Sequence, residues 1–315
     1  MRSLIYNLRG FGRLGRRSQL RSYMRQERVD ILGLQETIRP DFTSGELRSL
    51  ECGGQFAWNW VPADGHSGGL LLGFRDECFE DGVWRKGKFF ISADIYQCSN
   101  KAKWCFVLVY GPADHSRTGE FLDELEGEVT NCQLPLVVGG DFNLIRRRQD
   151  KSNEVVCWSR IRCFNDAIAA ISLREYNRAG ARFTWTNNQL DPIRSVLDRV
   201  FVSPSWETMF PLCSLSAVTR IGSDHNPLLL DSGESGLMRP PRFFFQTWWF
   251  HVAGFDELLR GKIEFCIHGK GPHRCSIELW QCISRSLRQF LKGWGRTSER
   301  RKGTSGRSSC ARWES

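Results

Sequence analysis

The 315-residue sequence lacks the features that mark secreted and membrane proteins. No apolar run approaches the roughly 18 residues of a membrane-spanning helix, and the arginine-rich start contains no signal sequence. The twelve cysteines are scattered without a Cys-x-x-Cys pair, so neither a disulfide framework nor a common zinc motif is indicated. We therefore expect an intracellular protein with reduced thiols and no membrane contact.

Acidic residues are scarce at both ends of the chain, and the net charge is +9. Residues 1–28 contain eight arginines and one acid, while residues 285–315 contain nine basic residues and two acids. The region between them is therefore net acidic, as expected where carboxylates surround a cation. The basic ends are suited to phosphate groups, although a solvated surface is an equally simple explanation.

Hydrophobic periodicity predicts a strand over residues 3–7, a helix over 16–28 and a buried strand over 30–34. Runs rich in Val, Ile, Phe, Tyr and Trp predict further strands at residues 57–61, 69–74, 89–96, 104–110, 134–138, 182–186, 196–202 and 227–230. Amphipathic patterns predict helices at 118–130 and 158–171. The sequence therefore predicts the α/β class, with two mostly antiparallel sheets packed face to face and flanked by helices.

A domain boundary is predicted after residue 232, where the chain becomes rich in Gly, Ser and Pro. Residues 1–232 then form the main domain and residues 233–250 a linker. Residues 251–291 have a partly helical pattern. Residues 292–315 form a disordered basic tail, because Gly, Ser, Arg and Lys cannot build a core.

Polar side chains follow the predicted strands in a pattern typical of phosphodiester hydrolysis. In chain order they are Asn7, Glu36, Tyr110, Asp141, Asn143, Asp198, Asp224 and His225. Open α/β sheets usually bind ligands at the carboxyl ends of their strands. The reaction needs a cation on the phosphoryl oxygens, a carboxylate that deprotonates water, and donors for the developing charge. Glu36 offers the hard oxygen atoms that Mg²⁺ prefers, whereas a single such glutamate is more often a surface residue.

Asp141 and Asn143 follow the apolar run 134–138, so two polar side chains leave a buried strand on the same side. Asp141 can accept a proton from water while Asn143 donates to the nucleophile or the phosphate. The alternative is a turn, since Gly, Asp and Asn are common turn residues.

Asp224 and His225 are adjacent, and neighbouring side chains in an extended backbone point in opposite directions. His225 can donate to a phosphoryl oxygen while Asp198 accepts from its second ring nitrogen and favours the imidazolium. Asp224 is then free to reach the metal. The alternative is a structural role, because isolated Asp-His pairs are common in proteins.

The combination resembles the endonuclease/exonuclease/phosphatase family, which includes DNase I and the apurinic/apyrimidinic endonucleases, and above all the endonuclease domains of plant LINE-type retrotransposons. The resemblance covers residues 1 to about 232 through Asn7-Leu8-Arg9-Gly10, Leu34-Gln35-Glu36-Thr37, Val109-Tyr110-Gly111-Pro112, Gly139-Gly140-Asp141-Phe142-Asn143, Phe183-Thr184-Trp185-Thr186-Asn187, Leu197-Asp198-Arg199 and Ser223-Asp224-His225. It implies the DNase I-like fold, a four-layered α/β/β/α sandwich. Arg9 is a departure, because apurinic endonucleases and DNase relatives often carry an acid there; the retrotransposon enzymes match better.

The resemblance also implies roles for these residues. Asn7, Glu36 and Asp224 would hold Mg²⁺, with Mn²⁺ as a substitute. The catalytic residues would be Tyr110, Asp141, Asn143, Asp198 and His225. Thr184 matches a position that lines the DNA groove, and Trp185 beside it is a further candidate for DNA contact. Residues 251–291 would be a remnant of the segment that precedes reverse transcriptase.

The leading hypothesis is a Mg²⁺-dependent DNA endonuclease that nicks one strand by in-line attack of water and leaves a 3′-hydroxyl. We expect a nuclear monomer that acts on DNA, or on RNA, without an obligate protein partner. A phosphatase or RNA exonuclease of the same fold would use the same residues. From a different class, the chain would be a non-catalytic remnant that binds nucleic acid through its basic ends.

Overall fold

The structure is a computed structural model that describes residues 1–12, 14–65, 67–220, 222–233, 250, 252–268, 279–280, 283–284, 286–287 and 290–291. The chain divides into two compact units, residues 1–236 and 237–315. The predicted tail at 292–315 and nearly all of the predicted linker at 233–250 lie outside the described residues. In the second unit, the described helix is α6 (Phe255–His268).

The first sheet of residues 1–236 has seven strands in the order β10-β14-β15-β1-β2-β4-β3. These strands are β1 (Arg2–Asn7), β2 (Ile31–Gln35), β3 (Phe56–Asp64), β4 (Ser67–Arg75), β10 (Arg178–Gly180), β14 (Ser214–Ala217) and β15 (Leu228–Asp231). β1 is parallel to β2 and antiparallel to β15, with Ile5 opposite Leu228. This register brings the carboxyl end of β1 next to the segment that leads into β15.

The second sheet has six strands in the order β5-β6-β7-β8-β13-β9. They are β5 (Phe79–Lys86), β6 (Phe90–Gln97), β7 (Lys103–Tyr110), β8 (Leu136–Asp141), β9 (Arg174–Glu175) and β13 (Asp198–Val202). Asp141 pairs with Tyr110 of the parallel strand β7 and with Asp198 of the antiparallel strand β13. Three polar residues therefore form one row across this sheet. A separate two-stranded ribbon joins β11 (Trp185–Thr186) to β12 (Arg194–Ser195).

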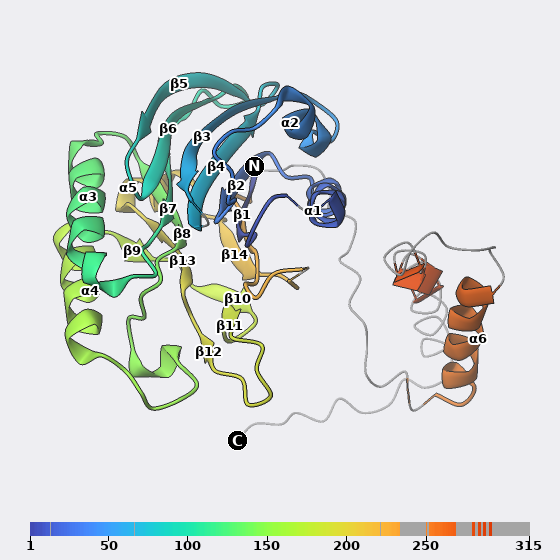
Figure 1. Cartoon of the computed structure of the whole chain (residues 1–315). Helices are drawn as coiled ribbons and strands as arrows, with labels where there is room; N and C mark the ends of the chain where they lie inside the picture. The colour runs from blue at the N-terminus through green and yellow to red at the C-terminus, as the bar shows by residue number, and fades with distance from the viewer. Residues whose placement is uncertain are drawn as a thin grey trace, which may run out of the picture. The chain divides into compact units, whose positions relative to one another are not determined.

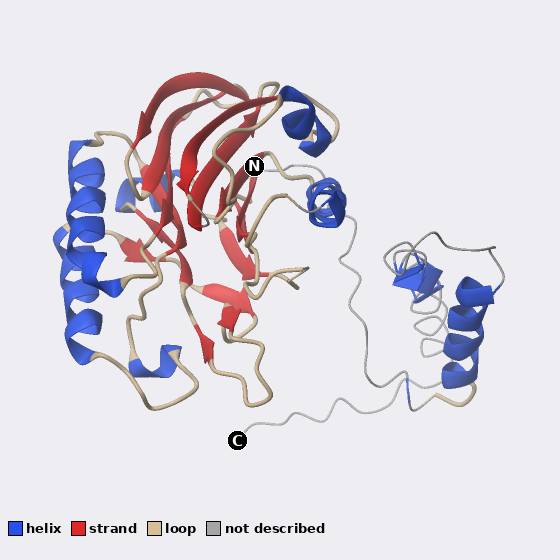
Figure 2. Cartoon of the chain, viewed as in Figure 1, coloured by secondary structure: helices blue, strands red, loops and turns tan. Residues whose placement is uncertain are grey.

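Helices cover the outer faces of the two sheets, which gives four layers (Figures 1 and 2). The helices are α1 (Leu14–Glu27) and α2 (Ser44–Leu50) over the first sheet, α3 (Thr118–Asn131) and α4 (Trp158–Ala170) over the second, and the short α5 (Pro204–Met209) after β13. Two 3₁₀ turns, η1 (His115–Arg117) and η2 (Arg148–Asp150), lie in the connections. No helix among the described residues is long and apolar enough to cross a membrane.

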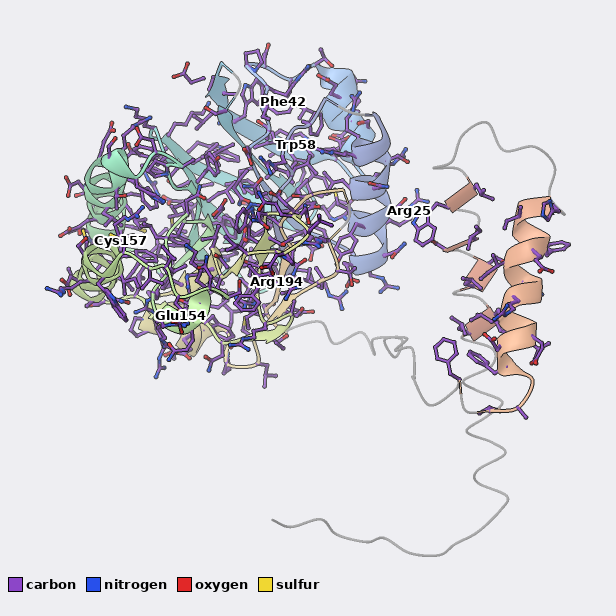
Figure 3. All side chains as sticks on the ribbon, turned by 60° about the horizontal axis from the view of Figure 1, so that its bottom comes forward. Arg25, Phe42, Trp58, Glu154, Cys157 and Arg194 are labelled. Atoms are coloured by element: carbon purple, nitrogen blue, oxygen red, sulfur yellow. The ribbon has the colours of Figure 1, made fainter. Side chains whose placement is uncertain are left out.

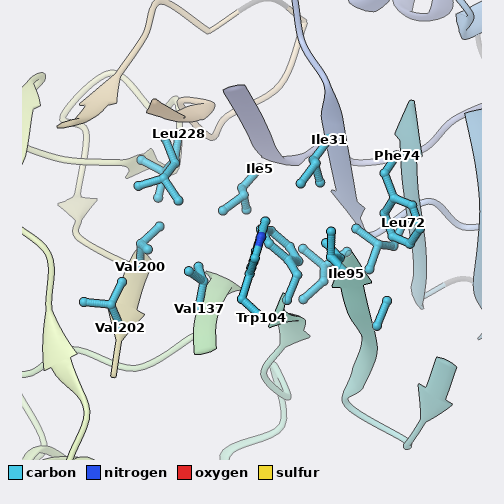
Figure 4. Close-up of a cluster of buried hydrophobic side chains, with 14 of the residues drawn as sticks. Ile5, Ile31, Leu72, Phe74, Ile95, Trp104, Val137, Val200, Val202 and Leu228 are labelled. Carbon is cyan, nitrogen blue, oxygen red and sulfur yellow. The ribbon is translucent and has the colours of Figure 1, made fainter. Parts of the chain in front are cut away.

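Strand β7 shows how the sequence builds these layers, because its alternating side chains face opposite ways. Trp104, Phe106 and Leu108 point into the core between the two sheets. Cys105, Val107 and Val109 join the core beneath α3 and α4. Figure 4 shows the core between the sheets, to which both sheets contribute aliphatic and aromatic side chains. The predicted fold class, an α/β/β/α sandwich, is confirmed.

Several elements were not predicted, namely the strands β5, β9, β10, β12 and β14, the helices α2 and α5, and the two 3₁₀ turns. β5 is interrupted by a register shift between Asp81 and Trp84, which breaks the alternation that marks a strand. α2 and α5 are too short for a clear amphipathic repeat. The strand predicted at 182–186 is wrong in its first half, because only β11 forms there. Phe183 instead accepts a hydrogen bond from the Asn226 amide at 3.0 Å.

Candidate active site

The predicted polar residues gather around one cavity of about 510 Å³ in the first unit. They come from the carboxyl ends of β1, β2, β7 and β8, from the start of β13, and from the segment before β15. The cavity lining includes Asn7, Glu36, Tyr110, Asp141, Asn143, Trp185, Asp224 and His225. Residues separated by more than two hundred positions thus meet at one edge of the two sheets.

Asp141 lies at the centre of the site and is almost fully buried. Its Oδ2 accepts a hydrogen bond from the Asn7 amide at 2.9 Å, and its Oδ1 accepts one from the Asn143 backbone at 2.9 Å. Burial raises the pKa of Asp141 above its usual range, while the charge of His225 opposes this shift. A carboxylate with a raised pKa is a better proton acceptor near neutral pH.

Two turns pack tightly beside Asp141 and fix Asn143. The Asn143 backbone has φ of +51°, a left-handed conformation that asparagine tolerates. Its amide donates to the Gly111 carbonyl at 2.8 Å. Gly111 is required here, because a Cβ at this position would lie 2.1 Å from the Phe142 carbonyl oxygen. The turn after β7 therefore holds the turn after β8 in place.

His225 is paired with Asp198, as predicted. The distance from His225 Nδ1 to Asp198 Oδ2 is 2.9 Å, and His225 Nε2 lies 3.7 Å from Asp141 Oδ2. Although burial lowers the pKa of His225, the carboxylates of Asp198 and Asp141 raise it to about 9. The imidazole is therefore protonated at neutral pH and can donate a hydrogen bond into the cavity.

Thr184, which was predicted to contact DNA, has no exposed surface. Its hydroxyl oxygen accepts hydrogen bonds from the backbone N–H groups of Leu197 at 2.9 Å and Asp198 at 3.0 Å. The side chain therefore does not line the cavity. It fixes the start of β13 and with it the carboxylate that orients His225.

Asn7, Glu36 and Asp224 lie near one another in the cavity lining, whereas Asp198, which pairs with His225, is not part of that lining. The Asn7 carbonyl accepts a hydrogen bond from the Ser223 hydroxyl at 2.8 Å, which ties the segment before β15 to β1. Burial raises the pKa of Glu36, the nearby Asp224 adds to this effect, and the charge of Arg9 opposes it. These are the electrostatics of a site that gains from a bound cation.

Arg9 and Trp185 both bind the Asp224 carboxylate. The Trp185 indole donates to Asp224 Oδ2 at 2.9 Å, and the Arg9 guanidinium forms an ion pair with the same oxygen. The Arg9 side chain is still 56% exposed, whereas Asp224 is buried. Arg9 thus supplies a partly exposed positive charge at the edge of the acidic cluster.

The hard oxygen atoms of Asn7, Glu36 and Asp224 fit a magnesium-type ion. Asp141, Asp198 and His225 also offer potential ligand atoms, which lie within 4.8 Å of one another. That cluster fits a metal poorly, because an imidazolium cannot act as a ligand. The donor chemistry therefore favours the side of the cavity that contains Glu36.

Tyr110 lines the cavity close to the carboxylates of Glu36 and Asp141. Burial raises the pKa of its phenol well above the ordinary value, and the negative charges of Glu36 and Asp141 act in the same direction. The phenol therefore stays neutral and can donate a hydrogen bond to a phosphate oxygen.

The sequence profile described as the endonuclease/exonuclease/phosphatase family matches residues 4–225, which is more than half of the chain. The chain belongs to this family. Its predicted membership is thereby confirmed, and its general reaction is hydrolysis of phosphoester bonds. A search of curated protein sequences gives no significant match.

Solved structures with the same fold include three nucleic-acid enzymes. The AP endonuclease LMAP from Leishmania major is 16% identical, with a TM-score of 0.60, over 73% of this chain and 86% of that one. The endonuclease domain of TRAS1, a telomere-specific non-LTR retrotransposon, is 16% identical, with a TM-score of 0.56, over 73% and 97% of the two chains. The 3′-5′ exonuclease NExo from Neisseria meningitidis is 18% identical, with a TM-score of 0.58, over 73% and 99%.

Some contributors to the site were not predicted as site residues. Ser223 had a visible signal, because it stands beside Asp224 in the matching motif. Arg9 was noted only as a departure from other family members. Three further residues that line the cavity, His115, Lys151 and Arg160, occur in no sequence pattern that marks a site.

Proposed function

We propose that the chain is a Mg²⁺-dependent DNA endonuclease of retrotransposon origin, which nicks one strand and leaves a 3′-hydroxyl. The observation that carries this proposal is the joint position of a buried carboxylate, Asp141, and a protonated histidine, His225, on one cavity. His225 Nε2 and Asp141 Oδ2 lie 3.7 Å apart, so both groups can act on one phosphate group, Asp141 on the attacking water and His225 on a phosphoryl oxygen.

Each residue has a defined task in this proposal. Asp141 orients a water molecule and accepts its proton as the water oxygen attacks the phosphorus in line. Asn143 donates to the attacking oxygen or to the phosphate. As the bond to the 3′ oxygen breaks, the leaving oxygen takes a proton from solvent.

The charge that develops on the phosphoryl oxygens is stabilised by two donors, His225 and Tyr110. Asp198 holds the His225 ring in orientation through Nδ1 and favours its protonated form. A divalent ion held by Asn7, Glu36 and Asp224 would supply Lewis-acid stabilisation of the same oxygens. Mn²⁺ has similar ligand preferences and is expected to substitute.

The choice of DNA as substrate is supported by the chemistry of the similar structures, among which are an AP endonuclease and the TRAS1 endonuclease domain. The arginine-rich helix α1 adds positive charge to the surface of the first unit, and the Arg25 side chain projects from this helix (Figure 3). Trp185 lines the cavity and is the better of the two predicted DNA-contact residues.

Conversion of supercoiled plasmid to open circles tests this function. We expect the purified full chain to nick plasmid with Mg²⁺ and to stop when a chelator is added. Asp141→Asn should reduce the rate by about 10²- to 10⁴-fold, the usual contribution of a general base. Asp166→Asn is a matched control, because Asp166 is an exposed aspartate on α4.

The alternatives give different results in the same assay. A phosphatase would release inorganic phosphate from end-phosphorylated DNA without opening circles. A non-catalytic remnant would bind plasmid but leave it supercoiled with every divalent ion. Either outcome in the parent chain refutes the proposed endonuclease.

A further inference from the structure

The cavity that contains Asp141 extends to a second wall, and this wall is basic. Its basic lining residues are His115 of η1, Lys151 after η2, and Arg160 in the first turn of α4. The acids that line the same cavity, Glu36, Asp141 and Asp224, all belong to the catalytic side. The cavity lining thus combines a carboxylate group, in which Arg9 pairs with Asp224, and a separate basic group on η1, the segment after η2 and α4.

Lys151 is held in place by a buried anchor. Arg199 is only 3% exposed in its side chain, and it donates to Asp150 Oδ2 at 2.5 Å. The same Asp150 oxygen accepts the backbone N–H groups of Arg146 and Arg147, each at 2.9 Å. The Asp150 carbonyl accepts the Val196 N–H at 2.7 Å, next to the strand that begins at Asp198. The loop that carries Lys151 is therefore fixed to the same strand that orients the catalytic histidine.

The basic groups on this wall are available for an anion. Within the described part of the chain, neither Lys151 nor Arg160 forms an ion pair with a carboxylate. Lys151 Nζ donates to the Val155 carbonyl at 2.8 Å, which leaves two of its three hydrogens for another acceptor. Partial burial lowers the pKa of His115, the positive charges of Arg160 and Lys151 add to the effect, and the charge of Asp114 opposes it. His115 is therefore an uncharged hydrogen-bonding group close to two cationic side chains.

Cys157 responds to the positive charge of Arg160. This residue precedes α4, where Figure 3 marks it together with Glu154. Hydrogen bonds from Ser159 and Arg160 lower the pKa of its thiol to about 6. Cys157 lines the cavity together with Arg160, which is one of the groups that favour its thiolate.

We propose that His115, Lys151 and Arg160 form a second phosphate subsite, which holds a phosphate group next to the one that is cleaved. The inference rests on the proposed function and narrows it. A substrate that fills both subsites carries neighbouring phosphodiesters, so its class is a polynucleotide. A small phosphoester would occupy only the carboxylate half of the cavity.

Binding and hydrolysis can be measured separately in the full chain with Lys151→Gln and Arg160→Gln, singly and together. Binding of a fluorescent duplex oligonucleotide is followed by anisotropy with Ca²⁺ over a range of salt concentrations. Hydrolysis of bis(4-nitrophenyl) phosphate with Mg²⁺ reports the catalytic half alone. Arg162→Gln is the matched control, because Arg162 lies on the same helix but outside the cavity. Lys151→Arg keeps the positive charge, so it should bind the oligonucleotide and hydrolyse the small diester like the parent.

The double variant should bind the oligonucleotide about tenfold more weakly and reduce the slope of log K against log salt by about 2. Its rate on the small diester should stay close to that of the parent. Equal loss on both substrates, or an unchanged salt slope, overturns the subsite. If the parent shows the salt-dependent binding but hydrolyses neither substrate, the proposed function fails while the subsite stands.

Discussion

Replacement of Thr184 by valine tests how the catalytic histidine is positioned. The Thr184 hydroxyl accepts the backbone N–H groups of Leu197 at 2.9 Å and Asp198 at 3.0 Å. Valine has nearly the same shape, so Thr184→Val removes this acceptor without creating a cavity. Both N–H groups then lose their partner at the start of β13.

The expected cost follows from these two bonds. A buried donor without a partner costs about 1–3 kcal/mol, so loss of two should lower the free energy of unfolding by about 2–6 kcal/mol. For a domain of this size, such a loss lowers the melting temperature by about 4–24 °C. Because Asp198 carries one of the two N–H groups, its carboxylate should lose its fixed position against His225, and the nicking rate should fall as well.

Urea unfolding and plasmid nicking at a permissive temperature measure the two effects. Thr184→Ser keeps the acceptor and should recover most of the activity. Thr186→Val is a matched control two residues further along, because the bond that the Thr186 hydroxyl accepts, from the Asn188 N–H at 3.3 Å, does not involve β13. If Thr184→Val unfolds like the parent and loses only affinity for DNA, Thr184 is a DNA contact as first predicted, and the positioning role is wrong.

Three further perturbations act on the charges of the site. The folded-state pKa of His225 is raised to about 9, so its pairing stabilises the fold by about 3 kcal/mol below about pH 6.5. This stabilisation is lost as the pH rises through 9. Urea unfolding at several pH values should show the loss in the parent and not in His225→Gln. Glu36→Gln should abolish the rise in melting temperature with Mg²⁺, whereas Glu80→Gln, at an exposed position in β5, should leave it intact; an undiminished rise in Glu36→Gln would place the ion elsewhere. Arg9→Gln removes a positive charge from Asp224, so half-maximal stabilisation should need less Mg²⁺, and a need for more would contradict the cationic role of Arg9.

The sequence could predict that most of these polar residues come together, because they stand at the ends of regular strands. Asp141 follows a continuous apolar run, and the sheet register then places it beside Tyr110 and Asp198. Once the strands are known, the side-chain direction follows from the alternation of the backbone. The fold class could be predicted for a similar reason. Alternate side chains of a strand such as β7 pack into different cores, one between the two sheets and one beneath α3 and α4.

Contacts made by irregular segments could not be predicted. The ion pair of Arg9 with Asp224 joins two loops that are 215 positions apart, and no local pattern reports it. Lys151 and Arg160 look like ordinary solvated residues in the sequence, because the cavity that they line forms only in the folded chain, where the buried Arg199 holds the loop before Lys151. A threonine such as Thr184 has the same chemistry whether it faces DNA or accepts backbone hydrogen bonds, and only its burial separates the two roles.

The 3′ end produced by the full chain on supercoiled plasmid tests the central claim most directly. We expect open circles that form with Mg²⁺, that do not form with Asp141→Asn, and that a DNA polymerase extends at once from a free 3′-hydroxyl. Nicks that need a phosphatase before extension, or nicking that survives Asp141→Asn, would contradict water attack at this site.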